Sequence, residues 1–314
     1  MILDRTLALL ARLLIALLQG LPLAWVARIG RTLGGLAYHL DARHRKVAIR
    51  NLQLALPGRM TPSTARDCAR ENFRRIGEGF ACLVKTATLS DAELAPHLEV
   101  DLPPSLRPQL QALKSRSIVA AIGHFGNFEL YARVLHQFPG YTGATTYRGL
   151  RQPSLNRLMQ SLRERSGCRF YERRTDAGAL RAALSNGGVL LGLLADQHAG
   201  DRGLPLPLFG RICSTSAAPA LFALRYQAPL LVPICYRVGP LRWRIELGDL
   251  IPTHTPAGEP RTPEELMAEV NRRYEAAIQR DPANWFWVHN RWKEGKHRKP
   301  APSPPAATAA TADP

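Results

Sequence analysis

The chain of 314 residues lacks paired cysteines and any convincing set of metal ligands. Its five cysteines, Cys68, Cys82, Cys168, Cys213 and Cys235, are odd in number, scattered and never arranged as Cys-x-x-Cys. This pattern argues against a disulfide scaffold and a cysteine zinc site, and it fits a reducing compartment. No spacing of His, Asp or Glu suggests a ligand set either, so we expect no metal.

Acidic residues are scarce: 25 Asp and Glu stand against 42 Lys and Arg, which gives a formal net charge of +17. Hydrophobic residues make up 46% of the chain and charged residues only 21%. This composition excludes a protein that consists mainly of a disordered basic tail. An apolar core with a positive surface points to nucleic acid, an anionic membrane or a phosphorylated substrate. The sequence contains no helix-turn-helix, zinc-finger or aromatic RNA-binding motif, and we expect no nucleic-acid partner.

A long uninterrupted apolar run is also missing, because Arg12, Gln19 and Pro22 interrupt the aliphatic segment at 7–27. A membrane span needs about 20 apolar residues. Spanning and interfacial arrangements therefore both remain open, and a buried core helix is the third reading. Six basic residues and a single acidic residue follow the segment: Arg28, Arg31, Asp41, Arg43, Arg45, Lys46 and Arg50. Such a patch is typical of the cytoplasmic side of an anionic membrane, so residues 1–40 are expected to be membrane-associated.

The remainder of the chain alternates between helical and strand patterns. Apolar runs predict buried strands at 117–123, 189–195 and 229–236, and alternation predicts an edge or half-exposed strand at 241–247. Helices are expected at 152–166 and 176–185, and after the starts Thr61-Pro62 and Thr262-Pro263. This order indicates an α/β fold with a mainly parallel central sheet flanked by helices. Residues 41–298 would form the catalytic domain and 299–314 a disordered tail.

The richest local chemistry is Gly123-His124-Phe125-Gly126-Asn127-Phe128-Glu129, directly after the strand expected at 117–123. A carboxylate that holds a His ring fixes its tautomer and stabilises the imidazolium, which makes the His a general base. A His in the turn after a strand can meet a Glu in the first turn of the next helix. The alternative is a hydrogen-bonded structural His.

The same spacing occurs at His254…Glu259 and His289…Glu294, so spacing alone is weak. His254 lies among prolines and glycine, and aromatic packing dominates around His289. Only His124 follows an expected buried strand and precedes a helix, where open α/β sheets place their sites.

The Gly123–Glu129 segment resembles the motif of the late acyltransferases of lipid A biosynthesis, part of the glycerolipid acyltransferase superfamily. Further segments match that family in order over roughly residues 5–298: Arg50-Asn51-Leu52, Tyr147-Arg148, Ala195-Asp196-Gln197, Leu231-Val232-Pro233-Ile234 and Trp287-Val288-His289-Asn290-Arg291-Trp292-Lys293. The resemblance implies a membrane-bound O-acyltransferase with a glycerolipid-acyltransferase-like fold. It would act at the cytoplasmic side of the inner membrane, and anionic membrane lipids would be partners.

The implied reaction moves a fatty acyl chain from an acyl carrier protein thioester to a hydroxyl of a phosphorylated glycolipid, a lipid A precursor. No other cofactor is implied, and coenzyme A remains open as the carrier of the donor. His124 would be the general base and Glu129 would orient it. An acyl-chain tunnel would lie near the N-terminal helix.

Five further residues are candidates for substrate binding. Asn127 and backbone N–H groups near Gly126 would donate to an oxyanion, and Arg148 would anchor a phosphate. Asp196 would be a binding or orienting carboxylate, or else a helix cap. Arg291 would meet lipid phosphates, or else belong to a plain basic C-terminus.

Two other functions remain open. The same chemistry could act on a lysophospholipid, an amino-acid lipid or a mannosylated lipid. A non-enzymatic basic protein that binds membranes or nucleic acid is the alternative of another class.

Overall fold

A computed structural model describes residues 2–113, 116–150 and 152–293. The disordered tail predicted at 299–314 lies outside these residues. All five cysteines lie inside them, and none of the five forms a disulfide.

The core is a five-stranded sheet in which every pair of neighbours is parallel. Its strand order is β4 (Arg169–Glu172), β3 (Thr142–Tyr147), β5 (Val189–Leu194), β2 (Ile118–Ile122) and β8 (Leu230–Leu231). Successive residues of β2 and β5 alternate between two apolar clusters, one on each face. The α/β fold with a mainly parallel central sheet is therefore confirmed.

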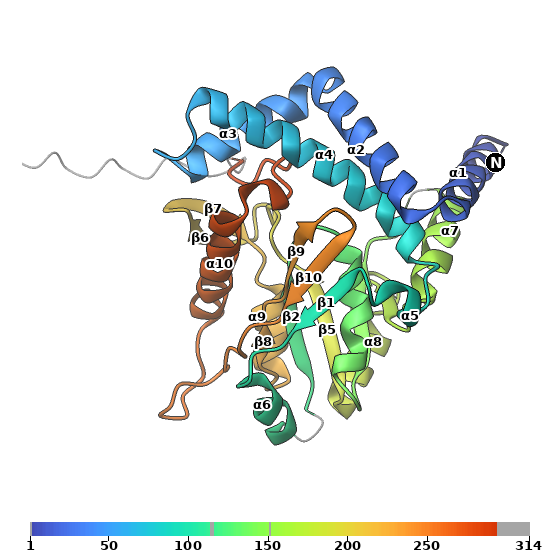
Figure 1. Ribbon diagram of the computed structural model, residues 1–314. Helices are drawn as coiled ribbons and strands as arrows, with labels where there is room; N and C mark the ends of the chain where they lie inside the picture. The colour runs from blue at the N-terminus through green and yellow to red at the C-terminus, as the bar shows by residue number, and fades with distance from the viewer. Residues whose placement is uncertain (1, 114–115, 151, 294–314) are drawn as a thin grey trace, which may run out of the picture.

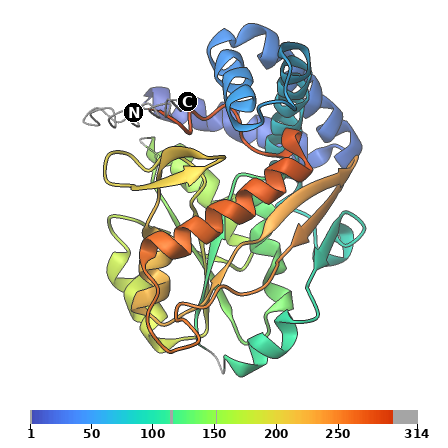
Figure 2. The same ribbon diagram turned by 90° about the vertical axis from the view of Figure 1, so that its left-hand side faces the viewer.

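Helices cover both faces of this sheet. The 3₁₀ helix η1 (Phe128–Gln137) and α7 (Pro153–Glu164) lie on one face. The other face is covered by α8 (Ala177–Asn186), α9 (Ala218–Arg225) and α10 (Pro263–Arg280), which ends before the short η2 (Pro282–Asn284). Figure 2 shows α10 running across the front of the molecule beside the hairpin of β6 (Leu204–Leu208) and β7 (Arg211–Thr215).

A second, smaller sheet is built from β1 (Leu98–Asp101), β10 (Arg242–Glu246) and β9 (Ile234–Gly239). The single strand predicted at 229–236 divides into β8 and β9 because the chain leaves the central sheet around Pro233. The half-exposed strand predicted at 241–247 is β10, which occupies the centre of this sheet rather than an edge. The short helices α5 (Asp91–Leu94) and α6 (Leu106–Ala112) flank β1 in the chain.

Four N-terminal helices complete the fold: α1 (Ile2–Gly20), α2 (Leu23–Leu40), α3 (Ala42–Ala55) and α4 (Pro62–Thr86). Figure 1 shows α2, α3 and α4 lying together above the strands, which we call the roof, while α1 extends to the side and packs on α7. Gly30 and Gly34 of α2 face Gly77 and Phe73 of α4 so closely that an added Cβ would collide with backbone oxygen. The second half of the 1–40 segment is therefore packed on the body of the protein.

The outer faces of α1 and α2 are strongly apolar. Nine leucine and tryptophan side chains of these two helices are more than half exposed: Leu9, Leu10, Leu13, Leu14, Leu17, Trp25, Leu33, Leu36 and Leu40. Within the described part of the chain, no helix combines the length and the hydropathy that crossing a bilayer requires.

Candidate active site

The register of two neighbouring strands brings His124 and Asp196 together. Ile122 at the end of β2 is paired with Leu194 at the end of β5, and each functional residue lies two positions further on. Because the strands are parallel, both side chains emerge at the same edge of the sheet. His124 Nδ1 lies 2.8 Å from Asp196 Oδ1.

Asp196 is a fully engaged carboxylate with a side chain only 1% exposed. Its Oδ2 accepts hydrogen bonds from the backbone N–H of His124 and from Trp285 Nε1–H, both at 2.8 Å. A carboxylate can only accept, so the His124 Nδ1 that faces Oδ1 carries the proton. The second ring nitrogen, Nε2, is left as the basic atom.

The electrostatics of the pair stabilise the charged form of both groups. Burial would lower the pKa of His124, but the charge and hydrogen bond of Asp196 outweigh it, with a smaller contribution from Glu129, and the pKa is raised. Burial would raise the pKa of Asp196, but the interactions with His124 and Trp285 outweigh it, and that pKa is lowered. A base of this kind accepts a proton more readily than an isolated buried His.

Glu129 does not occupy the position expected for the orienting residue. Its Oε1 accepts a hydrogen bond from Arg163 of α7 at 3.0 Å, and Asp196 holds the ring of His124 instead. The physical reason is the strand order, since β5 lies directly beside β2 and delivers a carboxylate to Nδ1. Glu129 acts on His124 only through its charge.

Gly126 and Asn127 differ in what they can offer to a substrate. The N–H of Gly126 already donates to Asn284 O at 3.1 Å, so it is not an available oxyanion donor. The side-chain amide of Asn127 is buried and has no hydrogen-bond partner among the described residues. Asn127 and His124 line the same cavity of about 20 Å³, with room for about one water-sized group.

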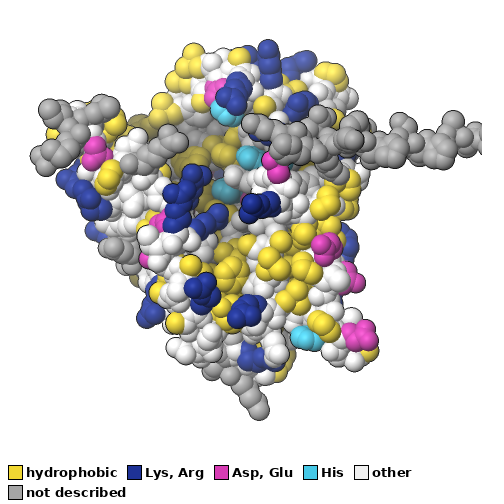
Figure 3. Space-filling model, turned by 180° about the vertical axis from the view of Figure 1, so that it is seen from behind, with side chains coloured by type: hydrophobic (Ala, Val, Ile, Leu, Met, Phe, Trp, Pro, Cys, Tyr) yellow, Lys and Arg dark blue, Asp and Glu magenta, His cyan; other side chains and the backbone are white. Residues whose placement is uncertain are grey.

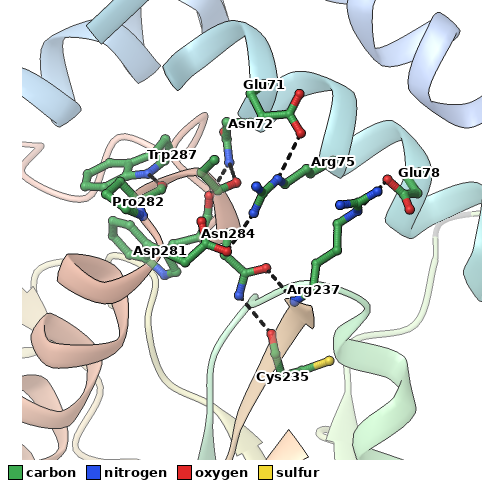
Figure 4. A network of polar contacts seen from close by, with 12 residues as sticks. Glu71, Asn72, Arg75, Glu78, Cys235, Arg237, Asp281, Pro282, Asn284 and Trp287 are labelled. Carbon is green, nitrogen blue, oxygen red and sulfur yellow. Dashed lines mark hydrogen bonds and ion pairs between the residues drawn. The ribbon is translucent and has the colours of Figure 1, made fainter. Parts of the chain in front are cut away.

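The roof and the C-terminal segment close this small cavity. Phe128 and Phe286 flank the ring of His124, with ring centroids 4.8 and 5.5 Å away. Asn72 of α4 donates to the carbonyl oxygens of Ala283 and Trp285, which holds the segment that carries Trp285 to Asp196 (Figure 4).

A chain of ion pairs ties the roof to the rest of the site. Arg75 of α4 bridges Glu71 and Asp281, at 3.0 and 2.7 Å, and Arg237 of β9 binds Glu78 at 2.9 Å (Figure 4). Arg31 of α2 contacts both Glu71 and Glu78, and it thereby connects the ion pairs of Arg75 with the ion pair of Arg237. These partners fix the angle at which α4 covers His124.

A large cavity of about 530 Å³, which we call the α7 cavity, lies beside the small one and shares Phe128 with it. Most of its wall is apolar and comes from η1, α7 and the even-numbered residues of β2 and β5. Arg148 and Arg173 line it, and both residues are exposed. Because α1 packs on α7, the cavity lies near the N-terminal helix.

A known protein family matches this chain over nearly its whole length. The model of the family described as bacterial lipid A biosynthesis acyltransferase matches residues 2–294. The chain belongs to this family. The resemblance stated from the sequence is thereby confirmed.

Two curated relatives of this acyltransferase-family chain come from Escherichia coli (strain K12). Lipid A biosynthesis lauroyltransferase is 28% identical over 275 residues, which cover 87% of each chain. Lipid A biosynthesis palmitoleoyltransferase is 25% identical over 282 residues, which cover 87% of this chain and 86% of the relative.

Arg291 has a structural place in this family member, contrary to the expectation of a lipid phosphate contact. Its side chain is buried and donates to Ser214 O and to Thr215 Oγ1, the latter at 2.9 Å. Burial lowers the pKa of Arg291. The guanidinium holds β7 against the C-terminal segment and does not face solvent.

Two residues of the site escaped the sequence analysis of this acyltransferase-family chain. Trp285 donates a hydrogen bond to the carboxylate of Asp196. His289 was set aside as part of an aromatic segment, yet its Nε2 accepts the N–H of His198 and its pKa responds to Asp196 and His124. Burial is the largest effect and lowers the pKa of His289. His254 lies elsewhere, in the loop between β10 and α10.

Proposed function

We propose that the protein is a membrane-bound O-acyltransferase that moves a fatty acyl chain from an acyl carrier protein thioester to a hydroxyl of a phosphorylated lipid A precursor. The observation that carries this proposal is the His124–Asp196 pair at the sheet edge, next to an apolar cavity large enough for an acyl chain. Membership of the lipid A acyltransferase family supports the acceptor class.

In the proposed mechanism His124 Nε2 removes the proton of the acceptor hydroxyl as its oxygen attacks the thioester carbonyl. Asp196 keeps the Nδ1 proton in place and stabilises the imidazolium that forms. The free amide of Asn127 donates to the oxyanion of the tetrahedral intermediate. When the intermediate collapses, the C–S bond breaks and the leaving thiolate takes the proton back from His124.

The protein offers an apolar cavity for a fatty chain and an exposed arginine for a phosphate. The fatty chain of the donor occupies the α7 cavity, and Arg148 binds a phosphate of the acceptor at its mouth. The exposed leucines of α1 and α2 attach the protein to the cytoplasmic face of the inner membrane. The thioester is already activated, so we propose no further cofactor.

The test compares the native protein with His124→Ala, and uses His254→Ala as a matched control outside the site. Purified protein receives lauroyl-acyl carrier protein or lauroyl-coenzyme A together with a phosphorylated lipid A precursor, and products are identified by mass spectrometry. We expect a precursor heavier by one acyl chain, formed from the acyl carrier protein, and a loss of about 10²–10⁴-fold in rate for His124→Ala only.

Equal rates for the native protein and His124→Ala would contradict the role of the base. Transfer to a different lipid added to the same mixture, with the precursor untouched, would contradict the acceptor. A preference for coenzyme A would contradict the donor.

A further inference from the structure

A second cavity of about 450 Å³ opens on the opposite face of the central sheet, between α8 and α9; we call it the α8–α9 cavity. Its wall is largely apolar and includes Leu180, Leu193, Leu221 and Phe222. Figure 3 shows the molecule from behind, where hydrophobic side chains gather in a patch bordered by Lys and Arg side chains. The mechanism proposed above makes no use of this cavity.

Three arginines line the α8–α9 cavity: Arg173, Arg181 and Arg225. Within the described residues their guanidinium groups make no hydrogen bond or ion pair. The one carboxylate in the wall, Glu172, is occupied by backbone N–H groups of Gly149, Arg174 and Thr175. The cavity therefore combines apolar walls with uncompensated positive charge, which complements an acyl chain that carries a phosphate.

The α8–α9 cavity shares part of its wall with the α7 cavity. Thr146, Arg173 and Leu194 line both this cavity and the α7 cavity, so the two meet at the ends of β3, β4 and β5. Leu194 lies two residues before Asp196. An acyl transfer between two lipids needs a site for each lipid near one base, and these two cavities both border the strand end that leads to Asp196.

We propose that the α8–α9 cavity binds the acceptor, with one of its existing acyl chains between α8 and α9 and a phosphate on Arg181 and Arg225. This inference rests on the proposed function, because it assigns the second substrate of that reaction. The sugar then lies across the strand ends near Arg173, and the α7 cavity remains for the donor chain.

The experiment uses the double variant Arg181→Ala/Arg225→Ala and the single variant Leu221→Gln, which changes a side chain that is 53% exposed. The matched control is Arg66→Ala/Arg107→Ala, since these exposed arginines on α4 and α6 line neither cavity. Steady-state kinetics are measured for a bisphosphorylated lipid A precursor and for its dephosphorylated form.

We expect the arginine variant to raise KM for the phosphorylated precursor by about tenfold or more, since each lost contact is a charge-assisted hydrogen bond. The kcat value and the KM for the acyl donor stay unchanged, and the preference for the phosphorylated precursor falls to the part that Arg148 supplies. Leu221→Gln raises KM for both precursors alike. Native values of KM in the arginine variant would overturn the proposal.

Direct binding separates this inference from the proposed function. Radiolabelled precursor in detergent is bound to the His124→Ala chain, with and without the arginine substitutions, and separated by gel filtration. Binding that depends on Arg181 and Arg225, without acyl transfer by the native protein, supports the site and overturns the reaction. No binding by His124→Ala, or equal displacement by phosphatidylglycerol, overturns the site.

Discussion

At the scale of single residues, the site depends on which carboxylate holds His124. Asp196 is buried and hydrogen-bonded to Nδ1, whereas Glu129 is committed to Arg163. The two carboxylates therefore differ in kind: Asp196 fixes the tautomer, and Glu129 contributes only charge. This difference can be measured, because both raise the pKa of His124 to different degrees.

Asp196→Asn removes the charge that raises the pKa of His124 and leaves the burial that lowers it. The neutral base then exists at lower pH, so we expect the acidic limb of the kcat/KM profile to move to lower pH. We expect the plateau value of kcat/KM to fall by about 10²–10⁴-fold. The NH₂ group of the Asn side chain cannot accept the hydrogen bonds that the carboxylate oxygens of Asp196 accept. The control is Asp201→Asn, an exposed neighbour, and the measurement is kcat/KM against pH.

Glu129→Gln is the decisive comparison for this assignment. We expect Glu129→Gln to move the acidic limb of the kcat/KM profile to lower pH as well, but by less than Asp196→Asn. The reason is that Glu129→Gln removes a charge but no hydrogen bond to His124. A larger displacement for Glu129→Gln than for Asp196→Asn would contradict the geometry described above.

The sequence points to the segment that carries His124, but not to the residue that holds its ring. A His after an apolar strand is visible in one segment, but the identity of its neighbour depends on β5 lying beside β2. Strand order results from packing across the whole sheet and leaves no local signal. The sequence indicates a binding or orienting carboxylate at Asp196, but it does not indicate that Asp196 and Trp285 meet or that Asp196 holds the ring of His124.

At the scale of elements, the roof depends on close packing of α2 on α4. Gly34 and Gly35 are adjacent in the same helix but differ in their surroundings. An added Cβ on Gly34 would collide with the backbone oxygen of Phe73, whereas on Gly35 it would meet only the side chain of Arg74 at 3.5 Å. The pair is a matched test of helix contact.

We expect Gly34→Ala to lower the free energy of unfolding by about 1–3 kcal/mol, because the helices must separate. Gly35→Ala should leave it unchanged or raise it by up to about 1 kcal/mol, since Ala favours a helix over Gly. Urea unfolding in detergent, followed by circular dichroism, measures both. Equal effects of the two substitutions would show that the contact does not limit stability.

The strands β2 and β5 were predicted from their composition, whereas β3 was missed. The runs that became β2 and β5 are buried on both faces and stand out in the sequence. β3 has the sequence Thr-Gly-Ala-Thr-Thr-Tyr and borders the α7 cavity, so its composition carries little apolar signal.

At the scale of the whole molecule, we expect the positive charge and the exposed leucines to act together in the proposed attachment to a membrane. The charge gives an attraction that salt weakens, and the leucines of α1 add an apolar term that salt does not weaken. The two contributions can be separated by substitution.

Leu13→Gln/Leu17→Gln changes two side chains that are 60% and 61% exposed. We expect weaker binding to vesicles that contain phosphatidylglycerol, and the loss should persist at high salt. The control Ile212→Gln/Val238→Gln alters exposed apolar residues on β7 and β9 and should bind as the native protein does. Vesicle sedimentation at two salt concentrations measures this, and equal binding by both variants would contradict an anchoring role for α1.

Glu78 links segments that lie far apart in the chain. Its side chain is 2% exposed and one oxygen accepts from Arg31 of α2 and from Arg237 of β9. If either arginine moves away, the buried carboxylate of Glu78 keeps only one of its two positive partners, which is unfavourable. We therefore expect the roof and the small sheet to open together. We therefore expect their amide protons to exchange with deuterium as one cooperative unit, and we expect a partner that binds α2 to slow exchange in β9.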